Sequence, residues 1–182
     1  MKMKTTDLVY TALGAVLIAV CSWVSIPLTV PFTLQTFAVF CVLELLGGKR
    51  GTLSIIVYIL LAAIGAPVLS GFKGGIGALL GMTGGYVLGF VFIGAIYRFS
   101  GMFFGNALPV RAGAMILGLA VCYAFGTAWF MTVYARQTGP IGVGQALLWC
   151  VIPFIIPDLL KMALAALLSS RIRKMGVLKA ES

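Results

Sequence analysis

Phe154-Ile155-Ile156-Pro157-Asp158-Leu159-Leu160-Lys161 places a carboxylate and an ammonium near the middle of an apolar segment, residues 146–168. That segment is long enough to be read as a membrane-spanning helix. A charge at the centre of such a helix costs about 2.5–3.5 kcal/mol on the insertion scale, so charged residues there are usually paired, face inward and serve a function. The pair is therefore the most informative point in the chain.

The two charged residues allow two interpretations. Asp158 and Lys161 are three residues apart, so their side chains share one face of the expected helix. One interpretation is a structural ion pair that holds helices together. The other is a polar floor beneath a bound ligand, which we favour because intramembrane charges mostly mark ligand or ion pathways. Pro157 removes one backbone hydrogen bond just before the pair and is a candidate kink.

The composition indicates an integral membrane protein. Of the 182 residues, 62% are hydrophobic and only 9% are charged, whereas soluble domains carry about 25% charged residues. No polar stretch is long enough for a second core, so residues 1–182 are expected to form one transmembrane domain. The net charge of +9 does not indicate binding to nucleic acid, because the basic residues cluster at segment ends in the pattern of membrane topology.

Six apolar segments predict an all-α protein with six transmembrane helices. A span needs about 20 residues, with a range of roughly 17–25. The second and third segments are shorter, so they are expected to be tilted into the bundle or extended by their flanking residues. The segments cover residues 8–26, 32–46, 51–66, 82–100, 112–134 and 146–168.

The basic residues predict the orientation of the chain in the cell membrane. Ten of them lie in the termini and in the loops on the same side as the N-terminus, and two lie in the opposite loops. Because loops rich in Lys and Arg stay on the cytoplasmic side, both termini are expected in the cytoplasm. The ten are Lys2, Lys4, Lys49, Arg50, Arg98, Arg111, Arg171, Arg173, Lys174 and Lys179, and the two are Lys73 and Arg136.

Two loops on the predicted outer side have unusual compositions. The first, residues 27–33, is apolar and contains two prolines, and it leads to Gln35. The second follows the third segment and, with the first residues of the fourth, contains seven glycines from Gly71 to Gly85. Glycine lets the backbone approach a ligand closely, and non-helical backbone at membrane depth is tolerated where it lines a cavity. This glycine-rich outer loop either caps an outward-facing ligand pocket, which we favour, or packs tightly against helices.

Three other features are also open at this point. Ala15 and Ala19 form a small-residue stripe on the first helix, suited to close packing inside the bundle or to docking a partner protein. Trp129 in the fifth segment is either part of the pocket or a member of the aromatic belt at the membrane surface. Glu44 is expected to form an interfacial ion pair with the basic residues 49–50.

Several catalytic and cofactor motifs are missing. The sequence has no histidine, which excludes imidazole catalysis, imidazole metal ligands and the usual triads. Gly48-Lys49-Arg50 does not complete a P-loop, because Leu43 stands where the first glycine belongs and Arg50 where Ser or Thr belongs. The four acidic residues are scattered, and the four cysteines have no metal or disulfide spacing. We therefore expect no enzyme activity, metal or cofactor, and an external source of energy for any active transport.

Three motifs together resemble those of one membrane-protein family. They are Pro31-x-Thr33-x-Gln35-Thr36, Gly81-x-Thr83-Gly84-Gly85-Tyr86-x-x-Gly89-Phe90 and Pro153-Phe154-x-x-Pro157-Asp158-x-x-Lys161. Their order and spacing, over nearly the whole chain, resemble the BioY family, the biotin-binding S components of energy-coupling-factor (ECF) transporters. Met82 departs from the proline that the family often has at that place, which bears on the conformation of the loop.

The resemblance implies a six-helix subunit that binds biotin with high affinity from outside the cell. It implies a transmembrane T component and two cytoplasmic ATPases as partners, or a solitary transporter that works without them. In S components a small-residue stripe on the first helix docks on the T component, and here that stripe would be Ala15 and Ala19. An S component for another water-soluble vitamin is the alternative.

The chemistry of biotin suggests roles for individual side chains. Its cyclic urea has two N–H donors and one carbonyl, next to an apolar thiophane ring and a valerate carboxylate. Asp158 suits the N–H donors, and Lys161 suits either the urea carbonyl or the carboxylate. The carboxylate is more easily accommodated near the outer loops, where Lys73 and the glycine-loop amides are available. The other residues expected to bind biotin are Phe32, Thr33, Gln35, Gly74, Gly75, Thr83, Gly84, Tyr86 and Trp129, with Phe72 as a further apolar candidate.

Overall fold

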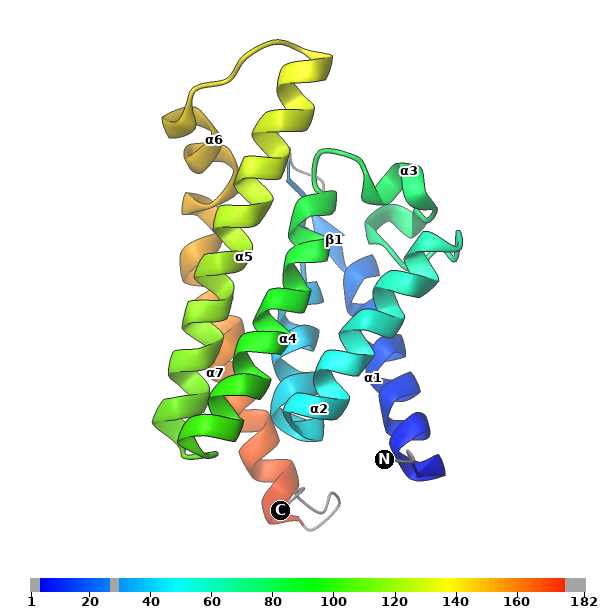
Figure 1. Cartoon of the computed structure of the whole chain (residues 1–182), viewed down its shortest axis with the longest axis vertical. Coiled ribbons are helices and arrows are strands. Elements are labelled where there is room, and N and C mark those ends of the chain that lie inside the picture. The colour runs from blue at the N-terminus through cyan, green and yellow to red at the C-terminus, as the bar shows by residue number, and fades with distance from the viewer. Residues whose placement is uncertain (1–3, 27–29, 176–182) are drawn as a thin grey trace.

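The fold is a bundle of helices that run along the long axis of the molecule (Figure 1). The computed structural model describes residues 4–26 and 30–175, so Lys2, Lys179 and residues 27–29 of the first outer loop lie outside the described residues. The elements are α1 (Thr5–Trp23), β1 (Ser25–Ile26), β2 (Phe32–Thr33), α2 (Gln35–Ala63), η1 (Ser70–Phe72, a 3-10 turn), α3 (Ile76–Leu79), α4 (Gly84–Phe104), α5 (Leu108–Gln137), α6 (Val143–Cys150) and α7 (Ile152–Lys174).

Helix α2 contains both the second and the third predicted segment. Its backbone leaves the helical conformation at Gly47, with φ 80° and ψ 169°, a conformation that glycine adopts more readily than other residues. A Cβ placed on Gly51 would lie 2.9 Å from the Cα of Leu43, eight positions earlier. Eight residues of a straight helix span about 12 Å, so α2 is folded back on itself into two arms, and the prediction of six helical passes is confirmed.

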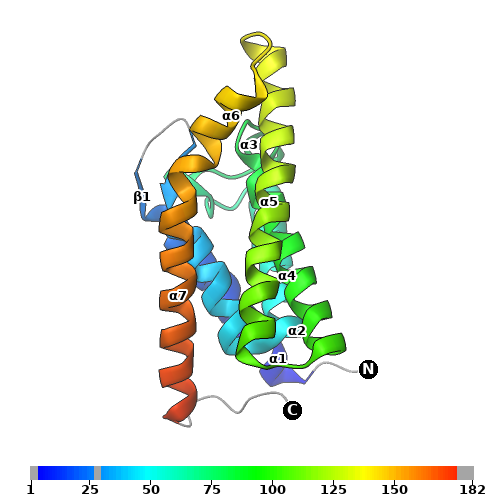
Figure 2. The ribbon, with the colours of Figure 1, turned by 90° about the vertical axis from the view of Figure 1, so that its left-hand side faces the viewer.

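The sixth predicted segment is divided into α6 and α7. The interruption occurs at Val151, where φ is −125° and ψ is −56°, and Pro153 follows in the first turn of α7. Proline is well suited to a first turn because its missing N–H would have no helical partner there. The helix continues through Pro157. The structure therefore puts the break six residues before the candidate kink, and Figure 2 shows α6 inclined to α7.

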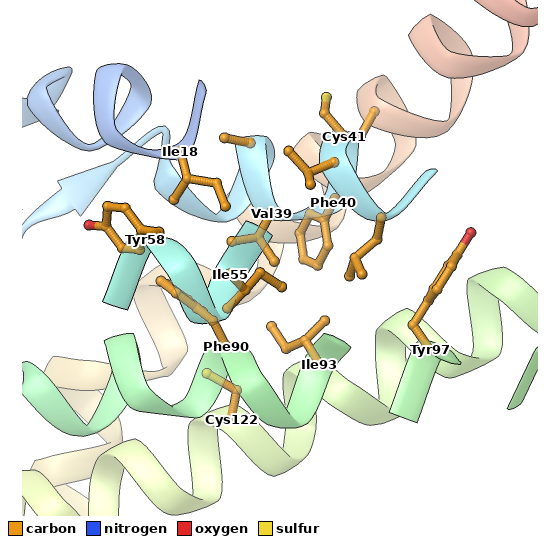
Figure 3. Close-up of a cluster of buried hydrophobic side chains, with 14 of the residues drawn as sticks. Ile18, Val39, Phe40, Cys41, Ile55, Tyr58, Phe90, Ile93, Tyr97 and Cys122 are labelled. Atoms are coloured by element: carbon orange, nitrogen blue, oxygen red, sulfur yellow. The ribbon is translucent and has the colours of Figure 1, made fainter. Parts of the chain in front are cut away.

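The helices pack closely because glycines lie at their crossings. A Cβ on Gly126 would lie 2.2 Å from the Tyr86 ring, and one on Gly118 would lie 2.8 Å from the Cα of Ile93, so α4 and α5 are nearly in backbone contact. Between α1, α2, α4 and α5 lies the main apolar core (Figure 3). Its labelled members in that view are Ile18, Val39, Phe40, Cys41, Ile55, Tyr58, Phe90, Ile93, Tyr97 and Cys122.

The small-residue stripe on α1 belongs to this core. Ala15 is 1% exposed and Ala19 is 5% exposed, and both pack among buried residues of the bundle. A Cβ on the neighbouring Gly14 would lie 2.5 Å from the Ser54 hydroxyl of α2. Ala15 and Ala19 thus face the interior of the bundle, which favours the packing interpretation of the stripe over the docking one. The close approach that small residues permit is used within the chain.

The two ends of the bundle differ in structure. The start of α1 and the end of α7 lie at one end, here called the terminal end, and α3, α6 and the β1–β2 pair lie toward the other, here called the loop end (Figures 1 and 2). Within the described part of the chain, five helical stretches are long and apolar enough to cross a membrane. They are Thr5–Trp23, Gln35–Ala63 with its two arms, Gly84–Phe104, Leu108–Gln137 and Val143–Lys174, and they define a multi-pass membrane protein.

Candidate ligand-binding cavity

A cavity of about 480 Å³ lies at the loop end of the bundle. A volume of this size is within the range of small-molecule sites. Its lining combines loop residues with residues of α2, α4, α5, α6 and α7. Phe154, Asp158 and Lys161 follow one another along one face of α7, so the two charged residues lie deeper in the bundle than Phe154. They form the floor of the cavity, and the loop residues 69–83 surround its mouth.

The floor is a buried ion pair with several hydrogen bonds. The Nζ atom of Lys161 lies 2.8 Å from Oδ1 of Asp158, and these residues are 7% and 2% exposed. The ammonium also donates to the backbone carbonyl of Thr33 at 2.7 Å and to the Thr36 hydroxyl at 3.0 Å. Its three N–H donors are thereby all used. Its charge is additionally stabilised by the Phe32 ring, whose centroid lies 4.2 Å away.

The carboxylate of Asp158 is held by three donors from three helices. The Thr36 hydroxyl of α2 donates to Oδ1 at 2.8 Å, beside Lys161, and the Tyr123 hydroxyl of α5 donates to Oδ2 at 2.6 Å. A carboxylate offers about four acceptor positions. Oδ2 therefore retains an acceptor position after these bonds. A charge fixed in this way by short hydrogen bonds is preorganised to accept an N–H donor from a ligand.

Gln35 provides a second polar group on the lining. Its Nε2 atom donates to the Tyr58 hydroxyl at 2.7 Å, and that hydroxyl donates to the backbone carbonyl of Val68 at 3.1 Å. Because Tyr58 uses its only proton toward Val68, it must accept from Gln35, which fixes the orientation of the amide. The amide oxygen of Gln35 then remains an acceptor at the cavity.

The structure brings seven of the eleven predicted ligand-binding residues onto the cavity lining. The other four lie close to it but not on it. Phe32 stacks behind the lining residue Phe154, with ring centroids 6.0 Å apart, and Trp129 donates its indole N–H to the carbonyl of Gly81 at 3.0 Å. The seven are Thr33, Gln35, Thr83, Gly84, Tyr86, Asp158 and Lys161, and the remaining two of the four are Gly74 and Gly75.

Other lining residues were not among the eleven predicted ligand-binding residues. Thr36 and Tyr123 are the main ones, since both bind the carboxylate of Asp158. Thr36 belongs to the Pro31–Thr36 motif, which is the signal that points to it. Tyr123 is one of several aromatic residues in an apolar segment, and only its hydrogen bond to Asp158 beside the cavity distinguishes it. Cys122 and Cys150 also line the cavity as free thiols.

A second buried ion pair lies toward the terminal end, away from the cavity lining. Glu44 is fully buried, and its Oε2 atom lies 2.7 Å from Nη1 of Arg111. Tyr97 donates to its other oxygen at 3.2 Å, and Arg173 donates to its backbone carbonyl. The sequence predicted that Glu44 pairs with the adjacent basic residues 49–50. In the structure it pairs with Arg111 of α5 instead. In residues 4–26 and 30–175 there is no cluster of three His, Cys, Asp or Glu side chains suited to a metal.

A multi-pass helical bundle with a polar-floored cavity open toward one end defines a membrane protein that binds a small solute. The model of the BioY family matches residues 1–177, and the chain belongs to the BioY family. It is 38% identical over 176 residues to the biotin transporter BioY of Thermotoga maritima, covering 94% of this chain and 98% of the relative. It is 37% identical over 175 residues to the probable biotin transporter BioY of Pyrococcus horikoshii, with the same coverage.

A solved structure has the same fold. The crystal structure of the S-component for biotin from an ECF-type ABC transporter aligns with a TM-score of 0.80 and 27% sequence identity, covering 95% of each chain. The agreement extends over nearly the whole bundle.

Proposed function

We propose that this protein takes up biotin as the membrane-embedded, substrate-binding S component of an ECF transporter. The observation that carries the proposal is the Asp158–Lys161 pair at the floor of the 480 Å³ cavity, in a chain whose relatives are named biotin transporters. A pair that only joined helices would be expected to face protein on every side. This pair lies on the cavity lining instead. The protein binds and moves its ligand and carries out no chemical reaction on it.

Within this proposal, the urea ring of biotin binds at the floor. One urea N–H donates to the free acceptor position of Asp158, and the amide oxygen of Gln35 is available to the other. The urea carbonyl is read by Lys161, which must give up one of its three bonds. The bond to Thr36 is the longest, at 3.0 Å, and is the one replaced. The aromatic rings of Phe90, Tyr86 and Phe154 on the lining contact the thiophane ring and the valerate chain.

The proposal includes an orientation and partners. The terminal end carries most of the described basic residues, so both termini lie in the cytoplasm and the cavity opens outward across the cell membrane. The sequence contains no complete P-loop, so ATP hydrolysis is supplied by two ATPase subunits through a transmembrane T component. A solitary form that works without them is the alternative. Because Ala15 and Ala19 are buried, another surface of the bundle carries that contact.

Titration of the detergent-solubilised protein with biotin, thiamine and riboflavin, by calorimetry and by thermal unfolding, tests the proposal. Biotin alone is expected to bind, and at a hundredfold excess over Kd it should raise the free energy of unfolding by about 2.7 kcal/mol. Binding of thiamine or riboflavin without biotin would reverse the assignment to another vitamin. No stabilisation by any vitamin would indicate a structural subunit instead.

A further inference from the structure

The charges on the cavity lining do not cancel. Three lining residues are charged, namely Asp158, Lys161 and Lys73. The first two neutralise each other across 2.8 Å at the floor. Lys73 lies at the mouth, on the loop between η1 and α3, and gives the cavity a net positive charge. A ligand that enters is therefore favoured if it carries one negative charge at its outer end.

No described acidic residue is available to pair with Lys73. Asp7 pairs with Arg50 at the terminal end, Glu44 pairs with Arg111 in the bundle, and Asp158 pairs with Lys161 at the floor. The sequence has only four acidic residues, and the fourth, Glu181, lies outside the described residues. In a chain with so few acids, a cation on the lining without an acidic partner among residues 4–26 and 30–175 points to an anion supplied by the ligand.

Lys73 is exposed, but the backbone on both sides of it is held by hydrogen bonds. The Leu69 N–H donates to the Lys73 carbonyl at 3.0 Å, and the Gly75 N–H donates to the Ala62 carbonyl at 2.7 Å. A Cβ on Gly74 would lie 2.2 Å from the carbonyl oxygen of Ala66, so only glycine fits beside this loop. These contacts hold residue 73 at the mouth of the cavity before any ligand arrives.

The residue before Lys73 strengthens this attachment. Phe72 adopts a positive φ of 57°, which is uncommon for a residue with a side chain and has to be compensated by its surroundings. Its ring stacks on Trp23 at a centroid distance of 5.0 Å, and the Trp23 indole donates to the Pro67 carbonyl at 2.9 Å. Phe72 is thus turned away from the cavity onto α1. Lys73, the next residue, lies on the cavity lining.

We propose that Lys73 binds the carboxylate of the ligand and thereby orients it, with the N–H-bearing ring toward Asp158 and the acidic chain toward the mouth. This inference rests on the proposed function. It makes the cavity selective for a monoanion over a neutral ligand with the same ring. It also leaves the carboxylate near solvent, where an anion loses less hydration energy than at the buried floor.

Calorimetric titrations with biotin and biotinamide test this role. The two ligands share the same ring and chain, and biotinamide carries a neutral carboxamide in place of the carboxylate. Lys73→Gln is expected to weaken biotin binding about tenfold, the effect of losing one charge-assisted hydrogen bond, and to leave biotinamide binding unchanged. Lys73→Arg should bind biotin within about threefold of the wild type, because the charge is kept. Arg136→Gln, which removes the other basic residue of the loop end from an exposed position off the lining, should affect neither ligand.

Two results would overturn the role of Lys73 while leaving biotin binding intact. One is biotin affinity in Lys73→Gln within twofold of the wild type. The other is an equal loss for biotin and biotinamide, which would indicate a structural effect of the substitution on the loop. Failure of the wild-type protein to bind biotin would instead count against the proposed function, so the two failures are distinguishable.

Discussion

Removing the charge of Asp158 separates two roles of the floor pair. Lys161 is 7% exposed, and Asp158→Asn removes the carboxylate that pairs with its ammonium among the described residues. Leaving one member of a buried ion pair uncompensated costs about 3–5 kcal/mol, which lowers the melting temperature of a chain of this length on the order of 10 °C. The double variant Asp158→Asn, Lys161→Met removes both charges. Its stability should return close to that of the wild type, because a neutral replacement of similar volume is often tolerated.

The double variant is expected to recover its stability but not its affinity for biotin. The double variant lacks the acceptor that the urea N–H requires, so its biotin affinity should remain at least tenfold lower, which corresponds to at least about 1.4 kcal/mol. The matched control is Glu44→Gln with Arg111→Met, the other buried pair, which lies off the cavity lining. That double variant should keep biotin affinity within about threefold.

The assay is thermal unfolding in detergent without biotin, followed by calorimetric titration with biotin of every variant that unfolds cooperatively. The reasoning is refuted if the Asp158→Asn, Lys161→Met variant binds biotin as tightly as the wild type. It is also refuted if the Glu44 control loses affinity to the same extent. Either result would mean that the floor pair acts on biotin only through the stability of the bundle.

Two other predictions concern packing and orientation. Gly126→Ala places a Cβ 2.2 Å from the Tyr86 ring. It should lower the free energy of unfolding by about 1–3 kcal/mol and weaken biotin binding. The control is Gly113→Ala in the same helix, which has open space around it and should be neutral or slightly stabilising in thermal unfolding. In a variant without native cysteines, an impermeant thiol reagent applied to intact cells should label Arg136→Cys and not Lys49→Cys. The reverse pattern would place the termini outside.

The six helical passes could be predicted because hydropathy alone determines them. The boundaries are less accurate, since helix ends depend on local contacts that hydropathy does not contain. The fifth segment was expected to end at residue 134, but α5 continues to Gln137. Two separate segments were expected at residues 32–46 and 51–66, and the structure places the turn between them at Gly47, where φ is positive. The break at Val151 has no comparable residue signal apart from the following proline.

The cavity was predictable to a smaller extent. Placing a charged side chain inside a membrane costs free energy, so charged residues in an apolar segment usually have a function. Asp158 and Lys161 could therefore be identified from the sequence. Thr36 and Tyr123 are ordinary polar residues for a membrane helix, and their role depends on α2, α5 and α7 meeting at one point. The alanine stripe illustrates the same limit. Small residues predict that something approaches α1 closely, and only the structure identifies that neighbour as the bundle itself.

The two buried ion pairs of this chain show why burial alone does not indicate function. Both lie in membrane-spanning helices, and both are completed by hydrogen bonds from at least two other helices. Glu44 is enclosed by α4, α5 and α7, off the lining of the cavity, so its pair joins helices and does not face the ligand site. Asp158 keeps an acceptor position at the edge of a cavity that suits a small molecule. A ligand in this cavity could complete the hydrogen bonds of the pair, and on this ground we propose that the floor pair contributes to binding as well as to helix packing.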